Sequence, residues 1–290
     1  MMAEAGHPPM EQGTPEDARL GFSLMQEMGG PGGDVAEVCN LHIDGVACRH
    51  YRHSTSSSSP VLLFFHGGGW VIGSLDSRDA VCRDLSAGAM CDVISVDYRL
   101  APEHPFPAPL DDTVAAFRAL VDEAPGLGLD PQRLANGGDS AGGNLATAAC
   151  LDLRDSGGPR PWLQVLIYPA CDLRLLADSI DEFATGFVLT RESMVWYRGH
   201  YTQIFDDPRV SVLLADLHDL PPAIVHTAGF DPLRDEGEAY VARLESAGVQ
   251  TRHLDAADQI HGFANMEGLL DGARREVDRL ALTLKAHARA

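Results

Sequence analysis

The chain has 290 residues, of which 45% are hydrophobic and 22% charged, as expected for a folded globular protein with a sizeable core. Its formal net charge of −20 argues against binding to nucleic acid or to anionic membranes, because both require clustered Lys and Arg. The six cysteines form no C-x-x-C pair, and the N-terminus lacks the basic and apolar regions of a secretory signal. We therefore expect free thiols in a cytoplasmic protein that does not enter a membrane.

The N-terminal segment is mostly polar and is predicted to contain one short helix. Residues 18–28 fit a helix that places Leu20, Leu24 and Met28 on one face. The sequence G-G-P-G-G at residues 29–33 then predicts a flexible break before the main domain.

After that break, apolar strands alternate with helical segments. Strands are predicted at residues 61–65, 91–96, 163–168, 223–228 and 251–255, after a hairpin at 35–53. Helices are predicted at residues 111–121, 141–153 and 232–247. Continuous apolar strands are typical of a sheet that is covered on both faces. The fold class is therefore α/β, with a mostly parallel sheet flanked by helices.

A long insertion separates the strands at 163–168 and 223–228. It holds six aromatic residues, namely Phe183, Phe187, Trp196, Tyr197, Tyr201 and Phe205. Long insertions in compact domains tend to be lids or binding elements. We favour a cap over the carboxyl edge of the sheet; an extra helix packed for its own stability is the alternative.

The glycine-rich stretch N-G-G-D-S-A-G-G-N contains the pattern G-x-S-x-G with Ser140 at its centre. Where a strand turns sharply into a helix, the backbone of the apex residue is strained. The positions two residues away on each side, occupied by Gly138 and Gly142, therefore need small residues. The helix N-terminus then favours negative charge beside the serine. Taken alone, the stretch also fits a tight turn without chemistry. It lacks the Gly-Lys-Ser/Thr ending of a phosphate-binding loop, which argues against nucleotide binding.

A second glycine-rich sequence, H-G-G-G-W, begins at His66 directly after the first buried strand. Consecutive glycines let the backbone approach a ligand and aim several N–H groups at one point. Such a loop supplies donors for the oxyanion of acyl transfer, together with the residue after the nucleophile. We expect the amides of Gly67, Gly68 and Ala141 to be these donors. His66 and Gly69 are expected to support the loop.

A nucleophilic serine needs a base and an orienting carboxylate, which in α/β-hydrolases follow it in the order acid, then histidine. Asp231 stands where the fourth buried strand ends, whereas Asp235 and Glu236 are expected to be surface or first-turn helix charges. Of the twelve histidines, His261 alone combines this order with a loop setting. No H-E-x-x-H or similar spacing occurs, so no metal site is predicted.

These motifs together resemble the hormone-sensitive-lipase-like family of α/β-hydrolase esterases, the bacterial group with an H-G-G-G loop. The matching stretches are H-G-G-G-W, D-Y-R-L-A-P-E-H-P-F-P-A, G-D-S-A-G-G, D-P-L-R-D-E-G and I-H-G-F, in family order. The resemblance implies an eight-stranded, mostly parallel sheet with a helical cap. It implies a cap built from residues 1–34 and 175–215, and an α/β-hydrolase core built from residues 35–174 and 216–290.

The resemblance further implies a serine carboxylesterase acting on short- to medium-chain carboxylic esters without a cofactor. Ser140 would form the acyl-enzyme, His261 would be the general base and Asp231 would orient it. Asp139 would be a hydrogen-bonding scaffold for the serine turn. Members of the family are often dimers, so a homodimer is expected to be possible. A ligand receptor without turnover is the alternative of another class, which the presence of His261 disfavours. Amide, lactone and thioester cleavage remain alternatives within the same chemistry.

Overall fold

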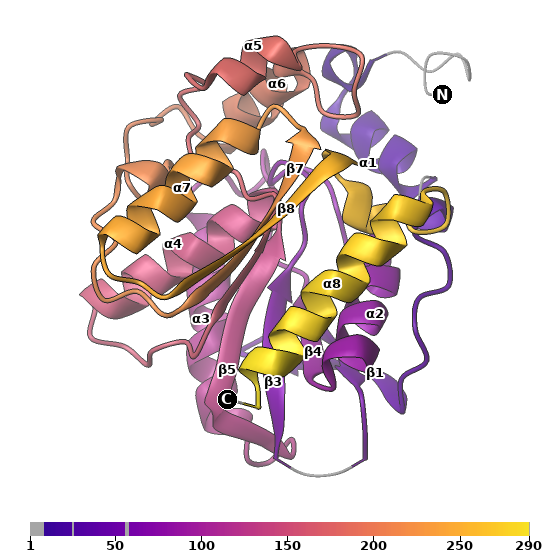
Figure 1. Cartoon of the computed structure of the whole chain (residues 1–290), viewed down its shortest axis with the longest axis vertical. Helices are drawn as coiled ribbons and strands as arrows, with labels where there is room; N and C mark the ends of the chain where they lie inside the picture. The colour runs from indigo at the N-terminus through magenta and orange to yellow at the C-terminus, as the bar shows by residue number, and fades with distance from the viewer. Residues whose placement is uncertain (1–8, 25, 56–57, 290) are drawn as a thin grey trace.

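An eight-stranded sheet forms the centre of the molecule (Figure 1). The computed structural model describes residues 9–24, 26–55 and 58–289, and the sheet lies within them in the order β1-β2-β4-β3-β5-β6-β7-β8. The strands are β1 (Glu37–Ile43), β2 (Val46–Arg52), β3 (Ser59–Phe65), β4 (Asp92–Val96), β5 (Leu129–Asp139), β6 (Gln164–Ile167), β7 (Ala223–Phe230) and β8 (Thr251–Ile260). Strand β2 runs antiparallel to β1 and β4, and the other neighbours are parallel. The predicted α/β class with a mostly parallel eight-stranded sheet is confirmed.

Helices cover both faces of this sheet. They are α1 (Pro15–Ser23), α2 (Asp79–Ala89), α3 (Ala108–Glu123), α4 (Ala141–Asp155), α5 (Asp178–Glu182), α6 (Arg191–Tyr201), α7 (Arg234–Ser246) and α8 (Asp271–His287). Short 3₁₀ turns are η2 (Met10–Gln12), η3 (Gln26–Gly29), η4 (Asp76–Arg78), η5 (Val212–Leu214) and η6 (Phe263–Asn265). Helices α2 and α8 pack together on one face, and α3, α4 and α7 lie on the other (Figure 1). Among the described helices, none combines the length and the apolar character needed to cross a bilayer.

Strand β3 explains why the central strands are apolar without interruption. Side chains alternate across a sheet, so neighbours along the strand enter different cores. Leu63 and Phe65 belong to the core under α3 and α4, whereas Leu62 and Phe64 belong to the core under α2 and α8. All four side chains are buried. Both faces of β3 are therefore covered, as the apolar run predicted.

The N-terminal helix differs from its prediction. Helix α1 begins at Pro15 because Thr14 caps it, its hydroxyl accepting from the Asp17 amide while the Asp17 side chain accepts from the Thr14 amide. It ends at Ser23, so the predicted helix over 18–28 is wrong at both ends. Leu20 and Leu24 are 65% and 66% exposed, which means that the predicted apolar face does not enter the core.

The G-G-P-G-G sequence is also packed more closely than expected of a flexible break. Gly32 has φ 68°, and a Cβ atom there would lie 2.8 Å from Cα of Ala80 on α2. The amide of Gly268 donates to the carbonyl of Met28 at 2.9 Å. Here glycine permits close contact between the N-terminal segment and the core.

The long insertion contributes α5, α6 and η5, and Figure 1 places α5 and α6 at the end of the sheet to which β7 points. Helix α6 begins with a second capping box, in which Thr190 and Ser193 bond each other's amides. Strand β8 is longer than predicted and continues to Ile260. Its extension carries the chain to His261, directly beside the end of β7.

Candidate active site

Ser140 occupies the sharp turn between β5 and α4. Its backbone has φ 55° and ψ −117°, which residues other than glycine rarely adopt. Its amide donates to the Ile167 carbonyl at 2.9 Å, which helps to hold this geometry. A Cβ atom at Gly138 or Gly142 would collide with the carbonyl oxygen of Phe65 on β3. The turn therefore requires both glycines of the G-x-S-x-G pattern.

Two neighbouring parallel strands bring the predicted base and acid to this serine. Asp231 follows β7, and His261 follows β8. Nδ1 of His261 lies 2.7 Å from Oδ2 of Asp231, and Nε2 lies 3.1 Å from Oγ of Ser140. The structure thus joins the three residues into one hydrogen-bonded chain.

The carboxylate of Asp231 determines which imidazole nitrogen carries the proton. A carboxylate only accepts hydrogen bonds, so Nδ1–H of His261 donates to Asp231. Nε2 then has a lone pair that accepts the hydroxyl proton of Ser140. Asp231 is fully buried, and its other oxygen accepts from the Leu233 amide at 2.8 Å. This arrangement can take the serine proton during attack and stabilise the imidazolium that forms.

Asp139 joins the serine turn to the glycine loop. Its Oδ1 accepts from the Gly67 amide at 2.8 Å and from Nε of Arg78 at 2.9 Å, and its Oδ2 accepts from Nη2 of Arg78 at 2.9 Å. Burial alone would raise the pKa of Asp139, but the charge and hydrogen bonds of Arg78 outweigh burial and lower that pKa. Asp139 is therefore an ionised scaffold. Its counter-ion Arg78, 61 residues away in the sequence, was missed because no local pattern marks it.

The bond from Gly67 corrects the predicted set of oxyanion donors. Because its N–H is committed to Asp139, Gly67 is not free to receive a substrate oxygen. Gly68 and Gly69 have φ 122° and 59°, and within the described residues neither amide donates to a protein acceptor. A Cβ atom at Gly68 would collide with the Ile72 carbonyl, and one at Gly69 with the ring of Tyr197. Two glycine amides thus remain available in a loop that excludes side chains.

His66 is buried beneath this loop. Its ring stacks on Tyr98 with centroids 4.3 Å apart, and its Nδ1–H donates to the Gly67 carbonyl at 2.9 Å. The hydroxyl of Tyr98 donates to the His66 carbonyl at 2.7 Å. Burial lowers the pKa of His66 to about 4, so the imidazole is neutral at neutral pH. These contacts support the positioning role expected for His66.

Tyr168 is a neighbour of the triad formed by Ser140, His261 and Asp231. Sequence reasoning missed this tyrosine. It follows β6 with φ 35°, and its ring centroid lies 4.7 Å from that of His261. Its hydroxyl accepts from the Asn265 side chain at 3.3 Å. The only sequence signal was its place as the last residue of the predicted strand at 163–168. Tyr168 packs against the imidazole and thereby restricts its orientation.

Glu236 lies in the first turn of α7, as one of the two expected alternatives had it, but it is buried and not a surface charge. Its Oε1 accepts from the amides of Cys171 and Asp172 at 2.6 and 3.1 Å. Within the described residues its Oε2 has no hydrogen-bond partner, and burial raises the pKa of Glu236 to about 8. The segment that it holds includes Ala170, whose amide donates to the Ser140 carbonyl at 3.2 Å. Glu236 therefore ties α7 to the back of the serine turn.

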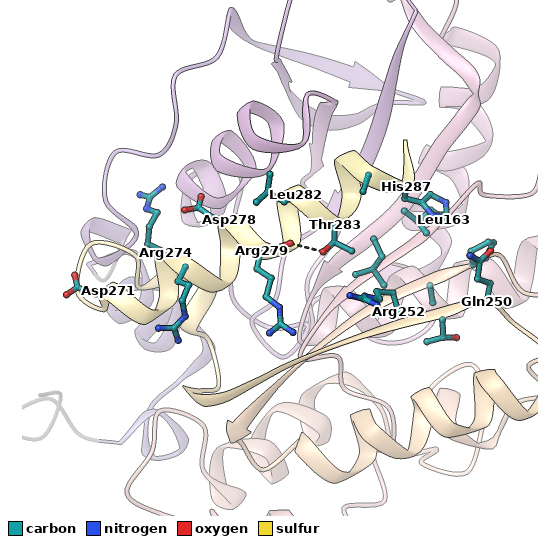
Figure 2. Close-up of a pocket in the computed structure, with 16 residues that line it drawn as sticks. Leu163, Gln250, Arg252, Asp271, Arg274, Asp278, Arg279, Leu282, Thr283 and His287 are labelled. Carbon is teal, nitrogen blue, oxygen red and sulfur yellow. Dashed lines mark hydrogen bonds between the residues drawn. The ribbon is translucent and has the colours of Figure 1, made fainter. Parts of the chain in front are cut away.

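A groove of about 990 Å³ lies elsewhere, between α8 and the first residues of β7 and β8 (Figure 2). Its lining includes Leu163, Arg252, Arg279, Leu282 and His287, and does not include the triad. Arg279 is already bonded to Glu276 and to a backbone carbonyl. We assign this groove no part in the chemistry of Ser140. The described residues contain no group of three or more His, Cys, Asp or Glu arranged to hold a metal ion.

Comparisons with known proteins agree with this geometry. A family model described as alpha/beta hydrolase fold matches residues 62–265. The carboxylic ester hydrolase LipN of Mycobacterium tuberculosis is 43% identical over 281 residues, covering 91% of this chain and 74% of LipN. Ethyl acetate hydrolase of Pseudomonas putida is 39% identical over 233 residues, covering 78% of this chain and 73% of that enzyme.

Solved structures are similar over nearly the whole chain. A serine-to-alanine variant of LAE6, an alpha/beta hydrolase enzyme from the metagenome of Lake Arreo, has a TM-score of 0.96 at 40% identity, covering 99% of this chain and 94% of that one. The thermophilic carboxylesterase EstE1, cloned from a metagenomic library, has a TM-score of 0.91 at 36% identity, covering 95% and 98%. The chain therefore belongs to the hormone-sensitive-lipase-like family of α/β-hydrolases, which its sequence motifs indicated.

Proposed function

We propose that this carboxylic ester hydrolase is a serine enzyme that acts on short- to medium-chain carboxylic esters through an acyl-enzyme on Ser140. The observation that carries the proposal is the chain of hydrogen bonds from Ser140 through His261 to Asp231, at 3.1 and 2.7 Å. The relatives named as ester hydrolases support ester hydrolysis as its reaction. The proposed steps use no cofactor.

In the first step, Oγ of Ser140 attacks the ester carbonyl carbon while Nε2 of His261 takes the hydroxyl proton. Asp231 stabilises the imidazolium. The tetrahedral intermediate collapses when His261 gives that proton to the leaving alcohol, which leaves an acyl group on Ser140. Water then attacks the acyl-enzyme by the same route and releases the carboxylic acid.

The developing oxyanion would be held by the amides of Gly68, Gly69 and Ala141. Gly69 replaces Gly67 in this set because the Gly67 amide is bonded to Asp139. Ala141 is the first residue of α4, where an amide has no partner within the helix and the helix dipole favours negative charge. Such preorganised donors stabilise the transition state more than the substrate.

The preference for short to medium acyl chains rests on the cap, which we assign to residues 1–34 and 175–215; residues 1–8 and 25 lie outside the described part of the chain. Tyr197 of α6 packs against Gly69, and its hydroxyl donates to Sδ of Met10. The insertion and the N-terminal segment therefore meet at the glycine loop. This contact restricts the space for an acyl chain. Ethyl acetate in the name of the Pseudomonas putida relative supports a small substrate.

Hydrolysis of p-nitrophenyl esters of graded acyl length tests this proposal. We expect activity on short and medium chains, and none above background in Ser140→Ala or His261→Ala. Ser246→Ala and His218→Ala are matched controls, because the Ser246 hydroxyl donates to the Ala242 carbonyl within α7 and His218 is exposed. A wild-type protein that is inert on all chain lengths and unlabelled by a serine-reactive organophosphate would refute the proposal.

The proposal includes a cytoplasmic location and allows a homodimer. The six cysteines are free thiols, which favours a reducing compartment. The terminal strands β1 and β8 each have one neighbour in the sheet, and an open strand edge can pair with a second copy. Light scattering distinguishes a monomer of 31.1 kDa from a particle of twice that mass.

A further inference from the structure

Helix α1 contacts the glycine loop through one charged side chain. Nε of Arg19 donates to the Val71 carbonyl and Nη2 donates to the Ala101 carbonyl, both at 2.9 Å. Val71 and Ala101 are fully buried. The guanidinium also forms two bonds of 2.7 Å with Glu103. One side chain of the N-terminal segment thus holds two buried backbone carbonyls of the core.

The Val71 carbonyl belongs to the turn at residues 68–72, which shapes the glycine loop. The amides of Val71 and Ile72 donate to the Gly68 carbonyl at 3.1 and 2.9 Å. The amide of Ala101 donates to the Trp70 carbonyl at 2.9 Å. Arg19 therefore crosslinks the end of this turn to the chain segment that supports it. A shift of Val71 would be passed to Gly68 through the two hydrogen bonds of the turn.

The same helix also reaches the start of the loop indirectly, through Arg78 and Asp139. Phe22 lies three residues after Arg19, on the same face of α1. Its ring centroid lies 5.3 Å from Cζ of Arg78, which is within reach of a cation–π contact. Arg78 bonds Asp139, which in turn accepts from the Gly67 amide. Helix α1 thus supports both ends of the loop that contains Gly68 and Gly69.

We propose that Arg19 is a positioning residue for catalysis, which fixes the oxyanion donors through the Val71 carbonyl. This inference rests on the proposed role of Gly68 and Gly69. The ion pair with Glu103 is half-exposed, and such pairs contribute little to stability. The two buried carbonyls matter more, because an unsatisfied buried acceptor is costly and would move to find another partner. The helix therefore couples the docking of the N-terminal segment to the geometry of the site.

The test is Arg19→Met, which keeps the aliphatic bulk and removes the donors. Loss of one oxyanion donor typically lowers kcat about 10²–10³-fold, so a displaced donor is expected to lower it about 10-fold. KM should change less than about twofold, because the oxyanion exists only after attack. A trifluoromethyl ketone, to which Ser140 adds while His261 takes the proton, leaves an oxyanion on the former carbonyl. Its inhibition constant should rise about as much as kcat falls.

Matched variants separate positioning from general stability. Glu103→Gln keeps both carbonyl bonds of Arg19 and should retain kcat within about twofold. Arg118→Met removes a surface arginine that bonds Ser156 between α3 and α4, and should leave kcat and the inhibition constant unchanged. Arg19→Lys, which retains one donor and the charge, should recover part of kcat. It also provides the comparison if Arg19→Met does not fold.

Equal kcat and equal ketone inhibition in wild type, Arg19→Met and Arg19→Lys would overturn the inference. A rise in KM with unchanged kcat would also overturn it, because α1 would then only line the substrate site. Failure of the proposed function looks different. In that case the wild type is inactive, or Ser140→Ala retains activity, whatever residue occupies position 19.

Discussion

The buried ion pair between Asp139 and Arg78 allows a quantitative test of how the serine turn and the glycine loop are held together. The two residues are 2% and 4% exposed and share two hydrogen bonds of 2.9 Å. Asp139→Asn keeps the shape of the side chain and an acceptor for the Gly67 amide, but leaves the guanidinium without a counter-charge. Breaking a buried pair on one side costs about 3–5 kcal/mol. We expect the free energy of unfolding at pH 7 to fall by that amount.

Urea unfolding followed by tryptophan fluorescence measures this loss. The pKa of Asp139 is lowered from 3.8 in the folded protein, so its stabilisation is complete above that value and is lost as the pH falls below it. The difference between wild type and Asp139→Asn should therefore stay constant from pH 7 down to about pH 4 and shrink only in stronger acid. A difference that disappears between pH 7 and pH 5 would contradict an ionised, paired Asp139.

A double-mutant cycle with Arg78→Met identifies the partner. Arg78→Met alone leaves Asp139 as an unpaired buried charge, whereas the double variant contains neither charge. The double variant should lose less stability than the two single variants together, by about 2–3 kcal/mol. Strictly additive losses would refute the reasoning, because they would mean that the two charges do not depend on each other.

Two further substitutions test buried groups around the site. In Glu236, whose pKa is raised from 4.5 to about 8, the folded state keeps a proton that the unfolded chain releases, so stability is lost as the pH rises through this range. Glu236→Gln should match wild type at pH 4 and be more stable by up to about 3 kcal/mol at pH 7 in urea unfolding; identical pH dependence would contradict this. Gly142→Ala, whose Cβ would collide with the Phe65 carbonyl, should lose about 3 kcal/mol or more, as seen in its melting temperature. Gly199→Ala is its control, because a Cβ atom at Gly199 would have no atom within 4 Å. This variant should gain about 0.5–1 kcal/mol in the free energy of unfolding.

The parts of the site that follow from local rules could be predicted from the sequence. The turn at Ser140 needs small neighbours for steric reasons, and these neighbours are adjacent in the chain. Asp231 and His261 could be found because parallel strands end at one edge of the sheet and the order of the residues restricted the choice. The alternation of apolar strands and helices predicted the sheet, since the central strands β3, β4 and β6 are buried on both faces.

The features that were missed or corrected depend on contacts between distant segments. Glu236 is in the first turn of a helix, where acidic residues usually face solvent, and becomes buried only because the segment after β6 crosses it. The choice between Gly67 and Gly69 as an oxyanion donor depends on the direction of a single amide, which Asp139 determines from 72 residues away. The exposure of Leu20 follows from Arg19, which turns its own face of α1 toward the core.

Three buried carboxyl groups around Ser140 differ in the partners that the fold gives them, in a chain with a net charge of −20. Asp139 is neutralised by Arg78, so its charge is balanced locally. Glu236 accepts from two backbone amides, and burial raises its pKa to about 8, so it remains mostly protonated at neutral pH. Asp231 alone is bonded to the imidazole of His261. If all three were ionised and unpaired, their mutual repulsion would oppose folding. With one paired and another protonated, the third, Asp231, is left as the partner of the imidazole, which is the orienting role that we propose for it.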